Sequence, residues 1–230
     1  TEGYRYGDFV IIARDITKYE RCLEQAAQTF EVPCFLDRRR GLIASPVARF
    51  VLSMLRAAGG FDSNAVFSLL KTGFFGFSTE EIARLEEYVY IWEIDRGDWL
   101  EEWKMDPRGF VSEEGAPSEN IQTGLDELNR LRKRVTGPLM RLKSAFSDGA
   151  AGISAMIYEQ LTALKVDRAV QTYCEGLLAE NDAKNADFVI ESWDLVMDAL
   201  DSMVRCFGNE AISAAEYTDM LELCFSGASV

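Results

Sequence analysis

Residues 9–57 place the strongest constraint on the fold, because apolar runs and helical patterns alternate along them. Residues 9–13 (FVIIA) form a continuous apolar run rich in β-branched side chains, which is typical of a strand buried in a parallel sheet. A helical pattern follows over residues 16–30, and residues 34–36 predict a second short strand. The order strand, helix, strand indicates a βαβ unit. Two parallel strands cannot bury both faces of a sheet, so the unit is expected to be incomplete.

Helical signals dominate the rest of the chain. A helix is expected to begin at Ser45 and Pro46, because serine is a preferred N-cap and proline suits the first helical turn. From Ser78 onward every periodic segment is helical, and Ser78 with Glu81 predicts a capping box.

The longest periodic segment spaces its apolar residues by three, four or seven positions, and this rhythm continues across Gly137 and Pro138. We therefore predict one long helix that is kinked at Pro138, although two helices broken at Gly137 are the alternative. The apolar residues are Ile121, Leu125, Leu128, Val135, Leu139, Leu142 and Phe146.

The predicted fold class is therefore mainly α. Residues 1–77 are expected to form a partial α/β unit with two short parallel strands and helices, and residues 78–230 a multi-helix domain. The chain opens with threonine rather than methionine, and we expect it to be a segment of a longer protein.

The net charge of −14 argues against a freestanding nucleic-acid binder, which would usually carry a basic face. The charge is uneven, with a balance of +2 over residues 1–58 and −16 over the remainder. An acidic remainder is typical of a solvated or partner-facing helical surface.

The chain has five cysteines and no histidine. The cysteines are widely separated and lack zinc or iron–sulfur spacing, so we expect buried free thiols in a reducing cytoplasm. The absence of histidine excludes Ser–His–Asp and Cys–His catalysis and histidine-containing metal sites. No apolar run reaches the ~18 residues that suggest a membrane span, so no membrane contact is expected.

Catalytic motifs are missing as well. No glycine-rich phosphate loop occurs, because Lys71 and Thr72 follow a leucine, and no cluster of acidic residues with a lysine suggests a metal nuclease. We expect no catalytic residue, metal site or cofactor within this chain.

Basic side chains are the candidates for DNA contact. Arg14 ends the first predicted strand, where α/β sheets place ligand-binding groups, although a pair with a neighbouring acid is the favoured interpretation. The run Arg38, Arg39 and Arg40 could contact the phosphates of a single strand or be a solvated turn. A second cluster includes Arg132, Lys133 and Arg134, for which pairing with acidic helices is favoured over a DNA path; its other members are Arg130, Arg141 and Lys143.

Two tryptophans, Trp99 and Trp103, lie one helical turn apart in an irregular stretch. They are candidates for base stacking or partner contact, although packing in the core is the favoured interpretation.

Several motifs carry a resemblance to a known family. The stretch FVIIARDITKYERCLEQAAQTFEVPCFLDRRRGLIASPVARFVLSMLRAA resembles the start of the second RecA-like domain of UvrD-type helicases. Together with VFSLLKTG at residues 66–73 and LEEYV at residues 85–89, it is similar to AddB/RexB, the B subunit of the AddAB helicase–nuclease. The resemblance covers roughly the first 100 residues well.

The resemblance implies that residues 1–77 belong to the second RecA-like domain and residues 78–230 to its helical insertion. It implies a cytoplasmic subunit that acts with an AddA-type partner on single- and double-stranded DNA, in end processing for homologous recombination and DNA repair. ATP, magnesium and an iron–sulfur cluster are implied for the parent helicase–exonuclease, a hydrolase, and none of them for this chain. The segment itself would shape the DNA channel or contact the partner subunit.

Two other functions are open. The acidic surface suits a helical protein–protein adaptor without DNA binding. A segment of an active UvrD-type, ATP-binding helicase is the other possibility, and it depends on sequence outside this chain.

Overall fold

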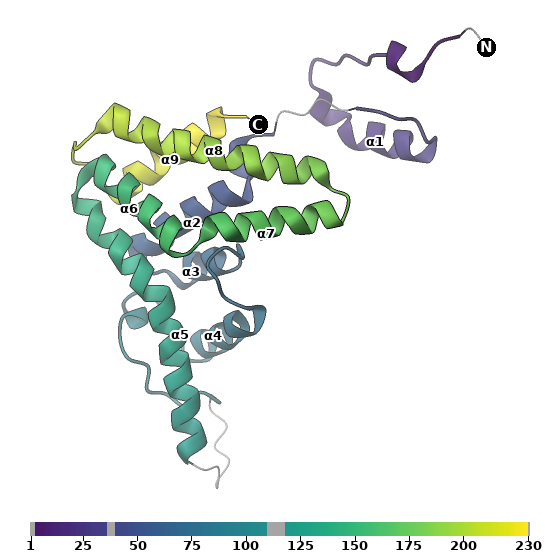
Figure 1. The fold of residues 1–230 in the computed structure, drawn as a ribbon. Helices are drawn as coiled ribbons and strands as arrows, with labels where there is room; N and C mark the ends of the chain where they lie inside the picture. Colours follow the sequence, from purple (N-terminus) through teal and green to yellow (C-terminus); the bar gives the residue numbers. More distant parts are fainter. Residues whose placement is uncertain (1–2, 36–39, 110–117, 230) are drawn as a thin grey trace. The chain divides into compact units, whose positions relative to one another are not determined.

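The computed structural model describes residues 3–35, 40–109 and 118–229 and is mainly helical (Figure 1). The chain divides into two compact units, residues 1–39 and residues 40–230.

Over its described residues, 3–35, the first unit contains two 3₁₀ turns, Tyr6–Asp8 and Ile16–Lys18, and one helix, α1 (Glu20–Thr29). The helix confirms most of the helical pattern expected over residues 16–30. It begins at Glu20, four residues later than predicted.

The predicted pair of parallel strands is wrong. Residues 9–13 and residues 34–35 form no strand, and residue 36 lies outside the described residues. The side chains of residues 9–12 are exposed, from 66% at Ile11 to 88% at Ile12, and Ala13 is half-buried. A strand needs a neighbouring strand to pair its N–H and C=O groups, and the described part of the chain supplies none.

The second unit is built around α2 (Pro46–Gly60). The Ser45 side chain accepts a hydrogen bond from the Val47 N–H, and Pro46 occupies the first turn, as predicted. Phe61 ends the helix in the left-handed conformation, with φ of 57°. Most of α2 is buried, and the helix packs against α3, α5, α8 and α9 (Figure 1).

Two shorter helices follow, α3 (Ser63–Leu70) and α4 (Thr79–Ile91). The Asp62 side chain caps α3 by accepting from the Ala65 N–H. Ser78 and Glu81 form the predicted capping box at the start of α4. A 3₁₀ turn, Arg96–Trp99, begins the connection toward α5.

The helix α5 (Ser118–Ser144) is continuous and contains Pro138, which confirms the prediction of one long helix. Its apolar stripe faces the core, where Leu128, Leu131, Val135, Leu139 and Leu142 are buried. Burial of this stripe outweighs the backbone hydrogen bond that the proline ring removes.

Four helices complete the unit: α6 (Gly149–Ala163), α7 (Val166–Ala179), α8 (Ala183–Phe207) and α9 (Ala214–Gly227). A 3₁₀ turn, Ala145–Ser147, links α5 to α6. The helices α6 and α7 both pack on α8 (Figure 1). At the end of the unit, the Leu42 N–H donates to the Ala228 carbonyl at 2.9 Å, so the segment before α2 meets the segment after α9.

The boundary between the two compact units lies at residues 39 and 40, whereas the predicted domain boundary lies near residue 77. The compact unit begins at Arg40, and α2 and α3 share one core with α4 to α9. A boundary near residue 77 concerns the organisation of a longer protein and stays a prediction.

The expected burial of the cysteines is wrong. All five thiols are free, but only Cys174 is buried; Cys22, Cys34, Cys206 and Cys224 are exposed. None of the described helices combines the length and apolar character needed to cross a bilayer.

The substitution Leu139→Ala should lower the free energy of unfolding by about 2–5 kcal/mol, because Leu139 is fully buried and alanine leaves a cavity. The adjacent Met140→Ala is the matched control, since Met140 is 44% exposed and should cost less than about 0.5 kcal/mol. Urea unfolding followed by circular dichroism measures both; equal costs would contradict this packing of α5.

Candidate nucleic-acid interface

A basic face runs along the outer side of α5. Arg130, Lys133, Arg134 and Arg141 are exposed, and their spacing of three, four and eleven positions places them on one side of the helix. No acidic residue occurs in the sequence from Arg130 to Ser144. We call these four residues the α5 basic face.

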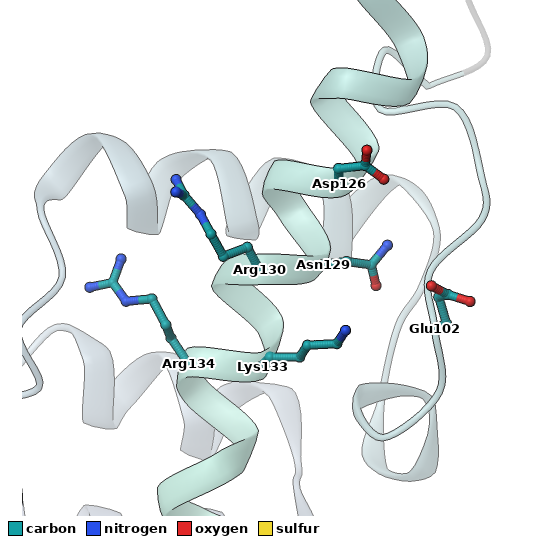
Figure 2. Close-up of a pocket in the computed structure, with 6 residues that line it drawn as sticks. All are labelled: Glu102, Asp126, Asn129, Arg130, Lys133 and Arg134. Carbon is teal, nitrogen blue, oxygen red and sulfur yellow. The ribbon is translucent and has the colours of Figure 1, made fainter.

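A shallow hollow of about 490 Å³ lies on this part of α5. Figure 2 shows Lys133 and Asn129 pointing toward the loop that carries Glu102, while Arg130 and Arg134 point away from that loop. Asp126 completes the lining. Three cations stand beside two carboxylates, so the hollow is of mixed charge and is not a closed anion site.

Arg134 is held within the fold. Its guanidinium forms an ion pair with Glu81, donates to the Gly76 carbonyl at 2.8 Å, and lies 4.2 Å from the ring centre of Phe77. Burial would raise the pKa of Glu81, but the Ser78 N–H and Arg134 together lower it. This pairing fits the intramolecular interpretation favoured for the second basic cluster.

The other cations of the α5 basic face are less engaged in ion pairs than Arg134. Arg130 reaches Glu127 only at 3.8 Å, and Glu127 is engaged by Arg84 at 2.8 Å. The hydrogen bond from Arg84 lowers the pKa of Glu127. Lys133 and Arg141 form no ion pair within the residues that the structure describes. These side chains are therefore able to meet phosphate groups.

Arg132 occupies a different environment, because it is only 5% exposed. Its Nε donates to Asn129 Oδ1 at 3.1 Å, and a terminal nitrogen donates to the Trp99 carbonyl at 2.9 Å. Burial lowers the pKa of its guanidinium. Arg132 is thus a structural group in this conformation and is turned away from any phosphate on the surface.

Trp99 and Trp103 are buried, with exposures of 0% and 3%. The Trp103 ring stacks on Tyr88 at 4.8 Å and meets the Trp99 ring at 5.4 Å. Both indole N–H groups have acceptors, namely Ser63 Oγ and the Asp98 carbonyl. Both tryptophans therefore pack in the core, as the favoured interpretation expected, and neither ring is accessible to a base.

The remaining candidates fall in two places. Arg14 is exposed in the first unit. Arg40 is half-buried, where it bonds the Asn185 side chain and lies 5.1 Å from the ring centre of Phe188 on α8. Arg38 and Arg39 lie outside the described residues.

Sequence reasoning missed Asn129. Its side chain accepts from the Trp103 N–H at 3.0 Å and donates to the Trp103 carbonyl at 2.8 Å, so it fixes the loop before α5 onto the helix. The sequence does contain an indication of this role, because Asn129 is a polar residue beside Leu128 on the apolar side of the helix.

Within the described residues, no group of three or more cysteine or acidic side chains is arranged to hold a metal ion. The expectation that this chain has no catalytic centre stays a prediction.

Comparisons with known proteins relate the chain to components of helicase–nucleases. No family model matches the chain. Proteins named as the B subunit of an ATP-dependent helicase/deoxyribonuclease match it from Acetivibrio thermocellus (30% identity over 228 residues), Thermoanaerobacter sp. (28% over 230) and Clostridium botulinum (26% over 228). These alignments cover 97–98% of the chain and 20% of each relative.

The chain is therefore homologous, over nearly its whole length, to a segment of these B subunits, and the predicted resemblance to AddB is confirmed. The chain spans about a fifth of the length of the curated relatives it matches.

Replacing Arg132 by alanine should lower the free energy of unfolding by about 1–3 kcal/mol or more, because Asn129 and the Trp99 carbonyl each lose a buried donor. The matched change Arg130→Ala removes an exposed guanidinium and should cost less than about 0.5 kcal/mol. Thermal unfolding followed by calorimetry separates the two. If Arg132→Ala is as stable as the parent chain, Arg132 does not have the structural role described here.

Proposed function

We propose that the chain is a structural segment of the B subunit of an ATP-dependent helicase–nuclease that processes double-strand DNA ends for recombinational repair. The homology along 97% of the chain to proteins of this name is the observation that carries the proposal. ATP, magnesium and any iron–sulfur cluster would be bound by other parts of the complex, and an AddA-type subunit would be the partner.

The proposed organisation assigns residues 1–77 to a RecA-like portion and residues 78–230 to a helical insertion. The exposed apolar run at residues 9–12 would then be covered by other parts of the longer protein. The exposed free thiols suit a reducing cytoplasm.

We propose that the α5 basic face guides a single DNA strand. Arg130 and Arg141 are eleven residues apart, which is about 16 Å along a helix that rises ~1.5 Å per residue. A row of this length and one helix wide suits a few successive phosphates of one strand. The acidic remainder of the chain would repel a duplex laid across a broader area.

The test is the affinity of the full-length subunit for single-stranded DNA at several salt concentrations. The variant Arg130→Ala/Lys133→Ala/Arg141→Ala should weaken binding at least about tenfold and reduce the slope of log K against log salt by about 2, since each phosphate contact contributes ~0.7. The variant Arg38→Ala/Arg39→Ala/Arg40→Ala tests the other predicted basic run in the same assay.

The control Arg49→Ala/Arg168→Ala/Arg205→Ala removes the same charge from exposed positions on α2, α7 and α8. It should leave the slope within about 0.5 of the parent value. An unchanged slope in the α5 variant, or an equal loss in the control, would show that the α5 basic face does not guide DNA.

A further inference from the structure

A hollow of about 980 Å³ lies between α3 and the end of α4, and it shares no lining residue with the hollow on α5. Its apolar lining includes Phe67 of α3, Val89 of α4 and Ile94, which follows α4. Val89 and Ile94 are only 6% and 5% exposed and anchor the lining in the core. We call this site the acidic hollow, because aspartate and glutamate side chains make up much of its lining.

Carboxylates surround the apolar lining. Asp62 and Asp95 line the hollow and also stabilise the fold. Asp62 accepts a hydrogen bond from the Ala65 N–H, and Asp95 accepts one from the Ser63 N–H. Glu86 pairs with Lys71 at 2.5 Å.

Two further carboxylates are exposed on the same hollow. Glu87 and Glu93 have no ion pair among the side chains that the structure describes. The hollow therefore keeps negative charge that the fold does not neutralise.

Tyr90 stands among these carboxylates and is 85% exposed. It lies three residues after Glu87, on the same side of α4. Glu93 follows the end of α4 and lines the same hollow. An aromatic face flanked by carboxylates suits a guanidinium or ammonium group, which stacks on the ring and pairs with the acids.

We propose that the acidic hollow binds a polypeptide segment of a partner protein through an arginine or lysine side chain. The cation stacks on Tyr90 and pairs with Glu87 and Glu93, and a neighbouring apolar side chain of the partner covers the lining at Phe67. The sign of the charge excludes a nucleic acid here. A second copy of this chain is disfavoured, because each copy carries a net charge of −14.

This inference is independent of DNA guiding, since it uses a different surface and a different ligand. An acidic helical segment would then join a complex through a basic segment on the other protein. Charge complementarity of this kind raises association rates and excludes acidic competitors.

The test measures binding of a fluorescein-labelled peptide, Gly-Arg-Leu-Arg-Gly-Arg-Leu-Arg-Gly, to the full chain by fluorescence anisotropy. Tyr90→Ala and Glu87→Gln/Glu93→Gln should each weaken binding about fivefold or more, whereas Tyr90→Phe should retain it, because the ring face is kept. The peptide with glutamate in place of arginine should not bind.

The matched control is Tyr158→Ala/Glu159→Gln, an exposed tyrosine and glutamate on α6, and it should change the affinity less than twofold. The proposal is overturned if the parent chain does not bind the arginine peptide, or if the control weakens binding as much as Tyr90→Ala. It is equally overturned if sedimentation shows a dimer of the parent chain that Tyr90→Ala dissociates, since the occupant would then be a second copy.

Discussion

The second unit depends on the burial of α2. Arg49 and Arg56 are the charged residues of this helix, and both are exposed, while most of its other side chains are apolar and buried. A helix that is apolar on nearly every side must be enclosed by other elements to be stable in water. The helices α3, α5, α8 and α9 provide this enclosure, which explains why segments more than a hundred residues apart share one core.

Within this enclosure α5 has two faces with different tasks. Its inner face packs against α2 and holds the loop before it through Asn129 and Arg132, so a guanidinium is buried with neutral acceptors. Its outer face carries Lys133 and Arg141, for which the described residues offer no carboxylate partner. The rigidity needed to hold cations in a fixed row would thus come from the same helix that stabilises the fold.

Local signals in the sequence predicted the helices well. The caps at Ser45 and Ser78 and the rhythm through Pro138 act within a few residues, so a single sequence reveals them. Strand pairing is not local, and the apolar run at residues 9–13 could not show whether a neighbouring strand exists. The environments of Arg132 and Arg134 likewise depend on tertiary contacts. Arg132 is buried, and the partner of Arg134, Glu81, lies 53 residues away in the sequence.

The central claim is that the outer face of α5 lies along a DNA strand while its inner face holds the fold. Photocrosslinking of the full-length subunit to single-stranded DNA that carries a photoreactive phosphate analogue tests this claim most directly. After digestion, mass spectrometry should find crosslinks on peptides that contain Lys133 or Arg141. Crosslinks that map to α7, α8 or α9 and leave α5 unmodified would contradict it.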